Sequence, residues 1–216
     1  MTWHPDIPLE YRNQIVTGDA RELAKRIPDE SIDMIFTSPP FKDEDVDVPY
    51  WEFYDALFSE MLRITKMVLV IIHSSTKLIE LVQRYPPNRL MIWGKGYSQY
   101  SYRYNPILVY QIGDYKANKY IWSDLFGVQS LYGNEKIHKY QDPLILYAAI
   151  IKMFRNCETV LDPCAGSGTT ASACKQLRRS YIAFEIDPAT ADLARERVLN
   201  TQPPLFVPEP EQLDMI

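Results

Sequence analysis

The stretch from Val160 to Thr170 constrains the fold more than any other part of the chain. It opens with short apolar strand residues, passes through Asp162 into a turn that holds Gly166 and Gly168, and continues as a helix from about Thr169 to Leu177. A strand, a glycine turn and a helix in this order form a small-molecule site in an α/β sheet. The glycines let the backbone approach a ligand closely, and the helix N-terminus supplies free N–H groups.

A second expected strand brings an acidic residue to the same turn. Residues 181–184 have the apolar and aromatic composition of a buried strand, and Glu185 follows them directly. An acidic residue at the end of the neighbouring strand is well placed to accept both hydrogens of a ribose diol, so we expect a ligand with an adenosine-like part. The turn from Gly166 to Ala171 also fits the relaxed dinucleotide fingerprint, which keeps a nicotinamide-dependent oxidoreductase as an alternative.

Another strand and loop lie far upstream of the glycine turn. Residues 32–36 have the pattern of a buried strand, and they lead into Thr37-Ser38-Pro39-Pro40-Phe41. Two consecutive prolines fix φ and remove two N–H donors, so this loop is stiff and displays carbonyl oxygens. Its chemistry is therefore hydrogen-bond acceptance.

Together, the loop from Thr37 to Phe41 and the turn from Asp162 to Thr169 resemble motifs of the S-adenosylmethionine-dependent DNA methyltransferases that modify exocyclic amino groups. The resemblance spans about residues 13–200, and the catalytic loop precedes the cofactor loop as in the circularly permuted beta class. It implies a Rossmann-like α/β fold with a seven-stranded sheet, S-adenosylmethionine as cofactor and double-stranded DNA as substrate. It also implies that the strands at 160 and 32 lie side by side, so that both motifs meet in one cleft.

The resemblance makes Ser38, Pro39, Pro40 and Phe41 the catalytic residues. An exocyclic amino group is a poor nucleophile, and its base must be flipped out of the duplex to be reached. Ser38 Oγ and the Pro39 carbonyl would accept the amino hydrogens, while Phe41 would stack on the flipped base. Family members that act on adenine usually have Asp or Asn in place of Ser38. We therefore favour cytosine N4 as the target, with adenine N6 and then RNA methylation as alternatives.

The cofactor residues implied by the resemblance surround the glycine turn. Cys164 stands where the family commonly has Phe, and its place in this turn argues against a covalent role. His138 and Gln141 match the family's His-Pro-x-Gln-Lys-Pro segment, in which Asp142 here replaces Lys. Asp19 either approaches the cofactor adenine or caps the helix that begins at Ala20. The expected set is Asp162, Pro163, Cys164, Gly166, Ser167, Gly168, Thr169, Glu185, Asp19 and His138.

The length of 216 residues fits one catalytic domain over residues 1–200, with a short target-recognition insertion at about 84–136. Residues 201–216, rich in proline and acids, are expected to be a flexible tail. The net charge of −5 argues against indiscriminate nucleic-acid binding, but residues 84–119 carry six basic side chains and one acidic one. From this region we expect DNA contacts by Arg89, Lys95, Arg103 and Lys116.

The sequence contains no run of 18 apolar residues and no signal peptide, so we expect a cytoplasmic protein that does not bind membranes. The resemblance implies that a prokaryote or a phage encodes it. Its three cysteines have no paired spacing, which indicates neither a disulfide framework nor a metal site. The resemblance adds a restriction-modification context and two candidate partners, a second copy of the chain and a cognate restriction endonuclease.

Overall fold

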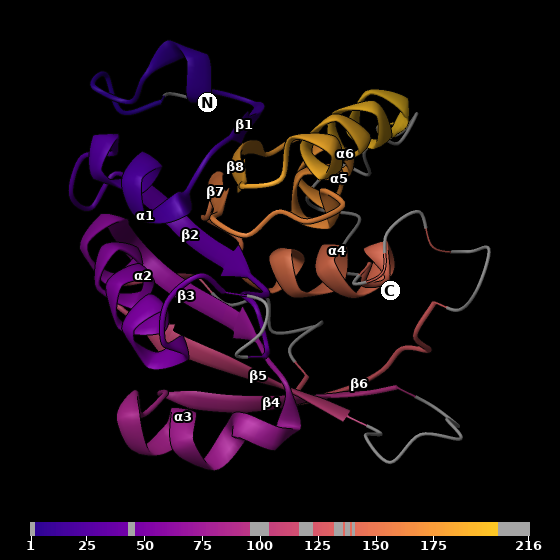
Figure 1. The fold of residues 1–216 in the computed structure, drawn as a ribbon. Coiled ribbons are helices and arrows are strands. Elements are labelled where there is room, and N and C mark those ends of the chain that lie inside the picture. The colour runs from indigo at the N-terminus through magenta and orange to yellow at the C-terminus, as the bar shows by residue number, and fades with distance from the viewer. Residues whose placement is uncertain are drawn as a thin grey trace.

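The computed structural model describes residues 3–42, 46–95, 104–116, 123–131, 136, 139 and 141–202. Within them, one sheet of eight strands has the order β1-β8-β7-β2-β3-β5-β4-β6 (Figure 1). The strands are β1 (Gln14–Thr17), β2 (Ile32–Thr37), β3 (Thr65–Ile72), β4 (Arg89–Gly94), β5 (Tyr104–Gln111), β6 (Leu125–Gly127), β7 (Thr159–Asp162) and β8 (Ser180–Glu185). Strand β5 runs antiparallel to both of its neighbours, and all other pairs are parallel.

Helices cover both faces of the sheet and give it two main cores (Figure 1). On one face, inward side chains such as Ile35 and Leu161 pack under α1 (Ala20–Leu23), α2 (Tyr50–Ile64) and α3 (Leu78–Arg84). On the other face, Phe36 and Val160 pack under α4 (Leu144–Met153) and α5 (Thr169–Gln176), and α6 (Pro188–Asn200) covers the β1 and β8 end. Because successive strand residues point to opposite faces, a continuous apolar run such as β2 serves both cores.

The expected α/β class is confirmed, and the central strands lie where the two motifs require them. Strand β2 pairs directly with β7, with Met34 opposite Val160 and Ile35 opposite Leu161. At the start of this pair, Asp33 Oδ2 accepts hydrogen bonds from the backbone N–H groups of Glu158 and Thr159, both at 3.0 Å, and from the Thr159 hydroxyl. This carboxylate fixes the register of two strands that are far apart in sequence.

Seven strands were expected, and the structure adds an eighth. Strand β6 is only three residues long and pairs with β4 at the edge of the sheet, so its sequence carries too little periodicity to be recognised. Near the N-terminus, Leu9–Tyr11 form a short 3-10 helix. Residues 203–216 of the expected tail lie outside the described residues. None of the helices in the described part of the chain is both long and apolar enough to span a membrane.

Candidate active site

A buried carboxylate joins the two motifs. Asp162 ends β7 and is 3% exposed. Its Oδ1 accepts hydrogen bonds from the Thr37 hydroxyl at 2.7 Å and the Cys164 N–H at 3.0 Å, and its Oδ2 accepts one from the Thr170 hydroxyl at 2.5 Å. Thr37 directly precedes Ser38, so one side chain links the catalytic loop, the glycine turn and helix α5. A direct contact of Asp162 with the cofactor stays a prediction.

Burial also changes the protonation of this group. Desolvation raises the pKa of Asp162 to about 6, although its hydrogen bonds from Thr170, Thr37 and the Cys164 backbone favour the ionised form. The charge of Glu185 raises this pKa further. The ionised carboxylate is therefore held at a cost in stability that the hydrogen bonds only partly offset.

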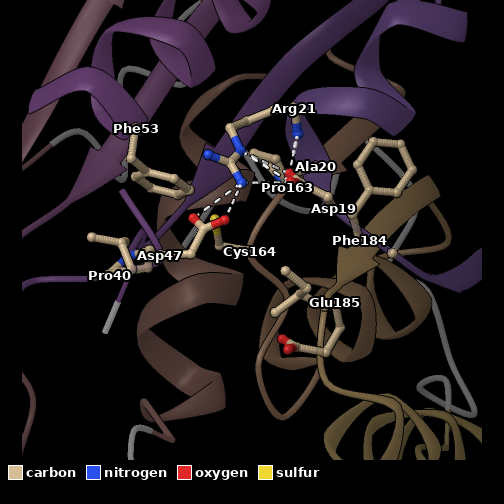
Figure 2. A pocket seen from close by; sticks show the side chains of 13 residues that line it. Asp19, Ala20, Arg21, Pro40, Asp47, Phe53, Pro163, Cys164, Phe184 and Glu185 are labelled. Atoms are coloured by element: carbon tan, nitrogen blue, oxygen red, sulfur yellow. Dashed lines mark hydrogen bonds and ion pairs between the residues drawn. The ribbon is translucent and has the colours of Figure 1, made fainter. Parts of the chain in front are cut away.

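A cavity of about 260 Å³ lies beside this junction (Figure 2). Four of the expected cofactor residues line it, and Pro40 of the catalytic loop lines it as well. Its wall comes from the end of β8, from the loops that follow β1, β7 and β8, from α1, and from the segment after β2 as far as Phe53 of α2. The lining residues are Gly18, Asp19, Ala20, Arg21, Pro40, Val46, Asp47, Phe53, Pro163, Cys164, Phe184, Glu185 and Ile186.

Glu185 and Asp19 are placed at the cavity by local hydrogen bonds. Glu185 Oε2 accepts from the Gly166 N–H at 2.8 Å, and Oε1 accepts from the Asp187 N–H at 3.0 Å. Asp19 caps α1 by accepting from the Arg21 N–H at 2.8 Å and lines the cavity at the same time. The interpretation of Asp19 as a helix cap is thus confirmed, while contact with the cofactor stays a prediction.

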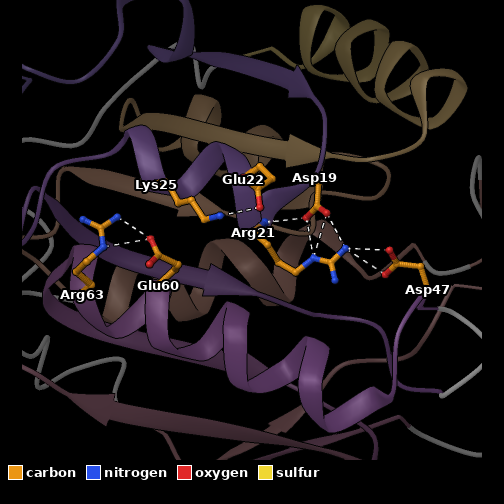
Figure 3. A network of polar contacts seen from close by, with 7 residues as sticks. All are labelled: Asp19, Arg21, Glu22, Lys25, Asp47, Glu60 and Arg63. Atoms are coloured by element: carbon orange, nitrogen blue, oxygen red, sulfur yellow. Dashed lines mark hydrogen bonds and ion pairs between the residues drawn. The ribbon is translucent and has the colours of Figure 1, made fainter.

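Arg21 had no expected role, but it connects two sides of the cavity. Its guanidinium binds Asp19 at 2.6 Å and Asp47, which follows the catalytic loop, at 3.1 Å (Figures 2 and 3). The Arg21 hydrogen bond lowers the pKa of Asp19, so this carboxylate is ionised at neutral pH. No sequence pattern signals this contact, because Arg21 lies on a short helix and Asp47 is 26 residues away.

Two residues of the glycine turn direct their side chains toward α6 and not into the cavity. Gly166 and Gly168 adopt φ values of 51° and 75°, which favour glycine. The side chains of Ser167 and Thr169 are buried, and their hydroxyls lie 3.0 and 2.9 Å from Arg197 Nη1 of α6. Neither residue lines the cavity. These two expected cofactor residues therefore contact α6 with their side chains.

The catalytic loop rests on two residues that the sequence did not mark. His73 Nδ1 accepts the Ser74 N–H at 2.7 Å, so the ring proton lies on Nε2 and is donated to the Tyr50 hydroxyl at 2.6 Å. Tyr50 in turn donates to the Pro40 carbonyl at 3.2 Å. Burial lowers the pKa of His73 to about 4, so the ring is neutral, and Phe41 lies 4.8 Å from it between ring centroids. His73 directly follows β3, the strand next to β2, and this position at the end of a central strand is the sequence signal that could have identified it.

The expected DNA-binding residues do not gather at this site. Because β4 runs parallel to β2, Arg89 lies at the end of the sheet away from Ser38, and the exposed Lys116, which follows the antiparallel β5, lies at that same end. Arg89 also forms an ion pair with Asp124, with Nη2 to Oδ2 at 2.8 Å. Lys95 follows β4 at the catalytic end and lies over the Trp93 ring at 5.0 Å. Arg103 and His138 lie outside the described residues.

Comparison with known proteins places this geometry in a family. A family model described as DNA methylase, for N6 and N4 methylation, matches residues 32–196. The chain belongs to this DNA methylase family. This membership excludes the nicotinamide-dependent oxidoreductase, the alternative that the glycine turn alone left open. The described fold agrees with the family membership.

Two curated relatives are type II methyltransferases. M.HinfI of Haemophilus influenzae is 25% identical, over 90% of this chain and 70% of its own length. M.BamHI of Bacillus amyloliquefaciens is 27% identical, over 87% of this chain and 57% of its own length. This chain thus spans only part of each relative.

Two solved structures share the fold. The structure of TTHA0409 of Thermus thermophilus aligns with this chain at a TM-score of 0.68 and 24% identity. The alignment covers 89% of this chain and 97% of the TTHA0409 chain. The cytosine-N4-specific PvuII DNA methyltransferase aligns at a TM-score of 0.69 and 17% identity. The alignment covers 88% of this chain and 93% of the PvuII chain. At these identities the likeness supports the fold alone.

The substitution Asp162→Asn tests the cost of the buried charge. The folded-state pKa of about 6 lies above the ordinary 3.8, so the folded protein binds this proton more tightly than the unfolded chain does. Wild-type stability is therefore lost as pH rises from 4 through 6, and Asn does not titrate. The quantity to compare is the free energy of unfolding of the variant minus that of wild type, measured by urea unfolding. We expect this difference to be larger at pH 7 than at pH 4 by on the order of 2–3 kcal/mol.

The matched control is Asp192→Asn, at an exposed residue on α6. It reports the general effect of removing one carboxylate. A stability difference between Asp162→Asn and wild type that stays constant over this pH range would contradict the assignment of a strained, buried charge.

Proposed function

We propose that this chain transfers a methyl group from S-adenosylmethionine to the N4 amino group of cytosine in double-stranded DNA. The observation that carries the proposal is the shared cavity. Pro40 of the catalytic loop lines the same space as Cys164, Glu185 and Asp19. A methyl donor held by the cofactor residues would therefore lie next to the loop that presents the base. Adenine N6 is the alternative target, followed by RNA.

The cavity suits S-adenosylmethionine chemically. Glu185 offers carboxylate oxygens to a ribose diol, Asp19 and Asp47 offer further acceptors, and Phe53 and Ile186 provide apolar walls. When bound, this cofactor supplies an electrophilic methyl group on a sulfonium. Structures of M1.HpyAVI and of TTHA0409, which share the fold, were solved with S-adenosylmethionine. The assignment of individual contacts to this chain is part of our proposal.

The catalytic loop would prepare the amino group for attack. Pro39 and Pro40 carry no N–H, so the loop offers acceptors, namely Ser38 Oγ and the Pro39 carbonyl. Accepting both amino hydrogens turns the nitrogen lone pair toward the methyl group and reduces its delocalisation into the ring. Phe41 would stack on the flipped base, supported from behind by His73. Positioning then supplies most of the catalysis.

We restrict the proposed DNA surface to the catalytic end of the sheet. Lys95 lies there, whereas Arg89 and Lys116 lie about a strand length away. Strands β4, β5 and β6 fall within residues 84–136, so target recognition would use the segments that connect them. Since the relatives are type II methyltransferases, we propose a restriction-modification context. A homodimer and a cognate endonuclease stay predictions.

Glu185→Gln tests the cofactor assignment. The amide replaces one carboxylate acceptor by a donor, and a hydrogen bond to a charged acceptor contributes about 1.5–3 kcal/mol. We expect the Kd for S-adenosylmethionine, measured by calorimetry, to rise at least about tenfold. Glu196→Gln, at an exposed position on α6, is the matched control. An unchanged Kd for the Glu185 variant would place the ribose elsewhere.

Nucleoside analysis tests the reaction itself. We would incubate the protein with S-adenosylmethionine and mixed-sequence duplex DNA, digest the DNA and identify the methylated base by mass spectrometry. N4-methylcytosine is expected, and Ser38→Ala should lower kcat by about 100-fold or more with little change in cofactor affinity. Ser59→Ala, at an exposed serine on α2, is the control.

The other outcomes separate the alternatives. N6-methyladenine would retain the mechanism but overturn the base assignment made from Ser38. Methylation of RNA but not of DNA would replace the substrate. Wild-type activity in Ser38→Ala would show that the catalytic role of this serine is wrong.

A further inference from the structure

Helix α6 holds the glycine turn from outside the cofactor cavity. Arg197 Nη1 donates hydrogen bonds to the Ser167 carbonyl at 3.0 Å, to the Ser167 hydroxyl at 3.0 Å and to the Thr169 hydroxyl at 2.9 Å. One guanidinium nitrogen thus contacts three oxygen atoms of the turn. Arg197 does not line the cavity, so it has had no role in the site described above.

The turn and the helix also lie in close contact at Gly168. This glycine has a φ of 75°, and a Cβ added to it would lie 3.1 Å from the Cβ of Ala194. A side chain at position 168 would therefore push the turn away from α6. Ala194 and Arg197 are three residues apart and share one face of the helix. The close contact at Gly168 thus brings the turn within reach of the guanidinium.

Arg197 directs its charge at neutral acceptors. It is partly buried, and none of the ion pairs between described residues includes it. Burial lowers the pKa of Arg197, because a charged group loses hydration there. Burying a charge costs stability, and hydrogen bonds to neutral oxygens offset only part of that cost. What Arg197 contributes is therefore the position of the turn.

The part of the turn that Arg197 holds lies next to the backbone group that fixes Glu185. The Gly166 N–H donates to Glu185 Oε2 at 2.8 Å, and Ser167 is the next residue. Glycine adopts many backbone conformations, so a contact at Ser167 limits the directions that the Gly166 N–H can take. The orientation of the Glu185 carboxylate, which lines the cavity, therefore depends on the place of Ser167.

We propose that Arg197 is a positioning residue for the cofactor, which fixes the glycine turn so that the Gly166 N–H holds the Glu185 carboxylate toward the ribose diol of S-adenosylmethionine. The inference rests on the proposed function, because it uses the assignment of Glu185 to the ribose. The side chains of Ser167 and Thr169 are then the acceptors through which Arg197 acts. Arg197 touches neither the cofactor nor the base, so its loss should weaken cofactor binding and leave kcat at saturating cofactor unchanged.

A double-mutant cycle in cofactor binding tests the proposal. The four proteins are wild type, Arg197→Met, Glu185→Gln and the double variant, and the Kd for S-adenosylmethionine is measured by calorimetry without nucleic acid. Methionine keeps an unbranched side chain and removes every donor. We expect Arg197→Met to raise the Kd about 5- to 30-fold, because hydrogen bonds from a charged donor are lost and the turn can shift.

The Glu185→Gln background decides whether Arg197 acts through Glu185. There, Arg197→Met should raise the Kd by less than about twofold, since the carboxylate that it positions is already gone. If the Kd rises by the same factor in both backgrounds, Arg197 does not act through Glu185 and the proposal is overturned. A wild-type Kd in Arg197→Met overturns it as well.

Lys175→Met is the matched control. Lys175 Nζ donates to the carbonyls of Val198 and Leu199 at 2.7 and 2.9 Å, so this cation holds the same helix without a contact to the turn. The variant should lose stability in urea unfolding and keep its Kd within about twofold of wild type. An equal rise of the Kd in Lys175→Met and Arg197→Met would assign the effect to general packing of α6 and overturn the proposal.

Thr169→Val keeps the test decisive if Arg197→Met fails to fold. Valine has the shape of threonine but lacks the hydroxyl that accepts from Arg197. We expect its Kd for S-adenosylmethionine to rise about threefold or more. An unchanged Kd in this variant would contradict the action of Arg197 through the turn.

Cofactor binding needs no nucleic acid, so the two proposals can fail separately. If wild type binds S-adenosylmethionine but methylates no nucleic acid, the proposed function fails, and the binding cycle still decides the role of Arg197. If wild type produces N4-methylcytosine and Arg197→Met binds the cofactor as wild type does, only the role of Arg197 is wrong.

Discussion

The hydrogen bonds that the Asp162 carboxylate accepts from Thr37, Thr170 and the Cys164 backbone hold this site together. Thr37 ends the strand that delivers the catalytic loop, and Thr170 lies in the first turn of α5. The segments that Asp162 joins are separated by about 125 residues of sequence, yet they must stay in register for a methyl donor and a base to meet. The pKa of Asp162 near 6 indicates that keeping this carboxylate charged lowers the stability of the folded protein at neutral pH. The charged group is retained where three hydrogen-bond donors converge on it.

From this junction the site divides into two functional sides. One side is the cavity, with Glu185 and Asp19 fixed by backbone N–H groups and with Arg21 connecting Asp19 to Asp47. The other side is the catalytic loop, which is supported at two points. Tyr50 donates to the Pro40 carbonyl, and the Phe41 ring lies against His73. Two prolines make the loop stiff, and Tyr50 and His73 support it after β2.

What the sequence could predict was local. The buried strands near residues 32, 160 and 181 followed from their apolar patterns, while the seven-stranded α/β sheet and the meeting of β2 with β7 were implied by the family resemblance. The direction in which a side chain leaves a turn could not be predicted from the sequence. Arg197 binds the hydroxyls of Ser167 and Thr169, and contact of these two residues with the cofactor stays a prediction. The spatial arrangement of the basic stretch could not be predicted from the sequence either. Its residues are close in sequence, but the strand directions place Arg89 and Lys95 at opposite ends of β4, and Asp124 neutralises Arg89 from the edge strand side.

The most direct measurement is a crystal structure of the protein with S-adenosylmethionine bound. We predict that the ribose diol contacts Glu185, that the cofactor fills the cavity between Asp19 and Cys164, and that its methyl group faces the loop from Ser38 to Phe41. A cofactor bound elsewhere, for example in the hollow formed by Leu193, Arg197 and Asn200, would contradict this arrangement. So would a cofactor in the cavity whose methyl group points away from Ser38.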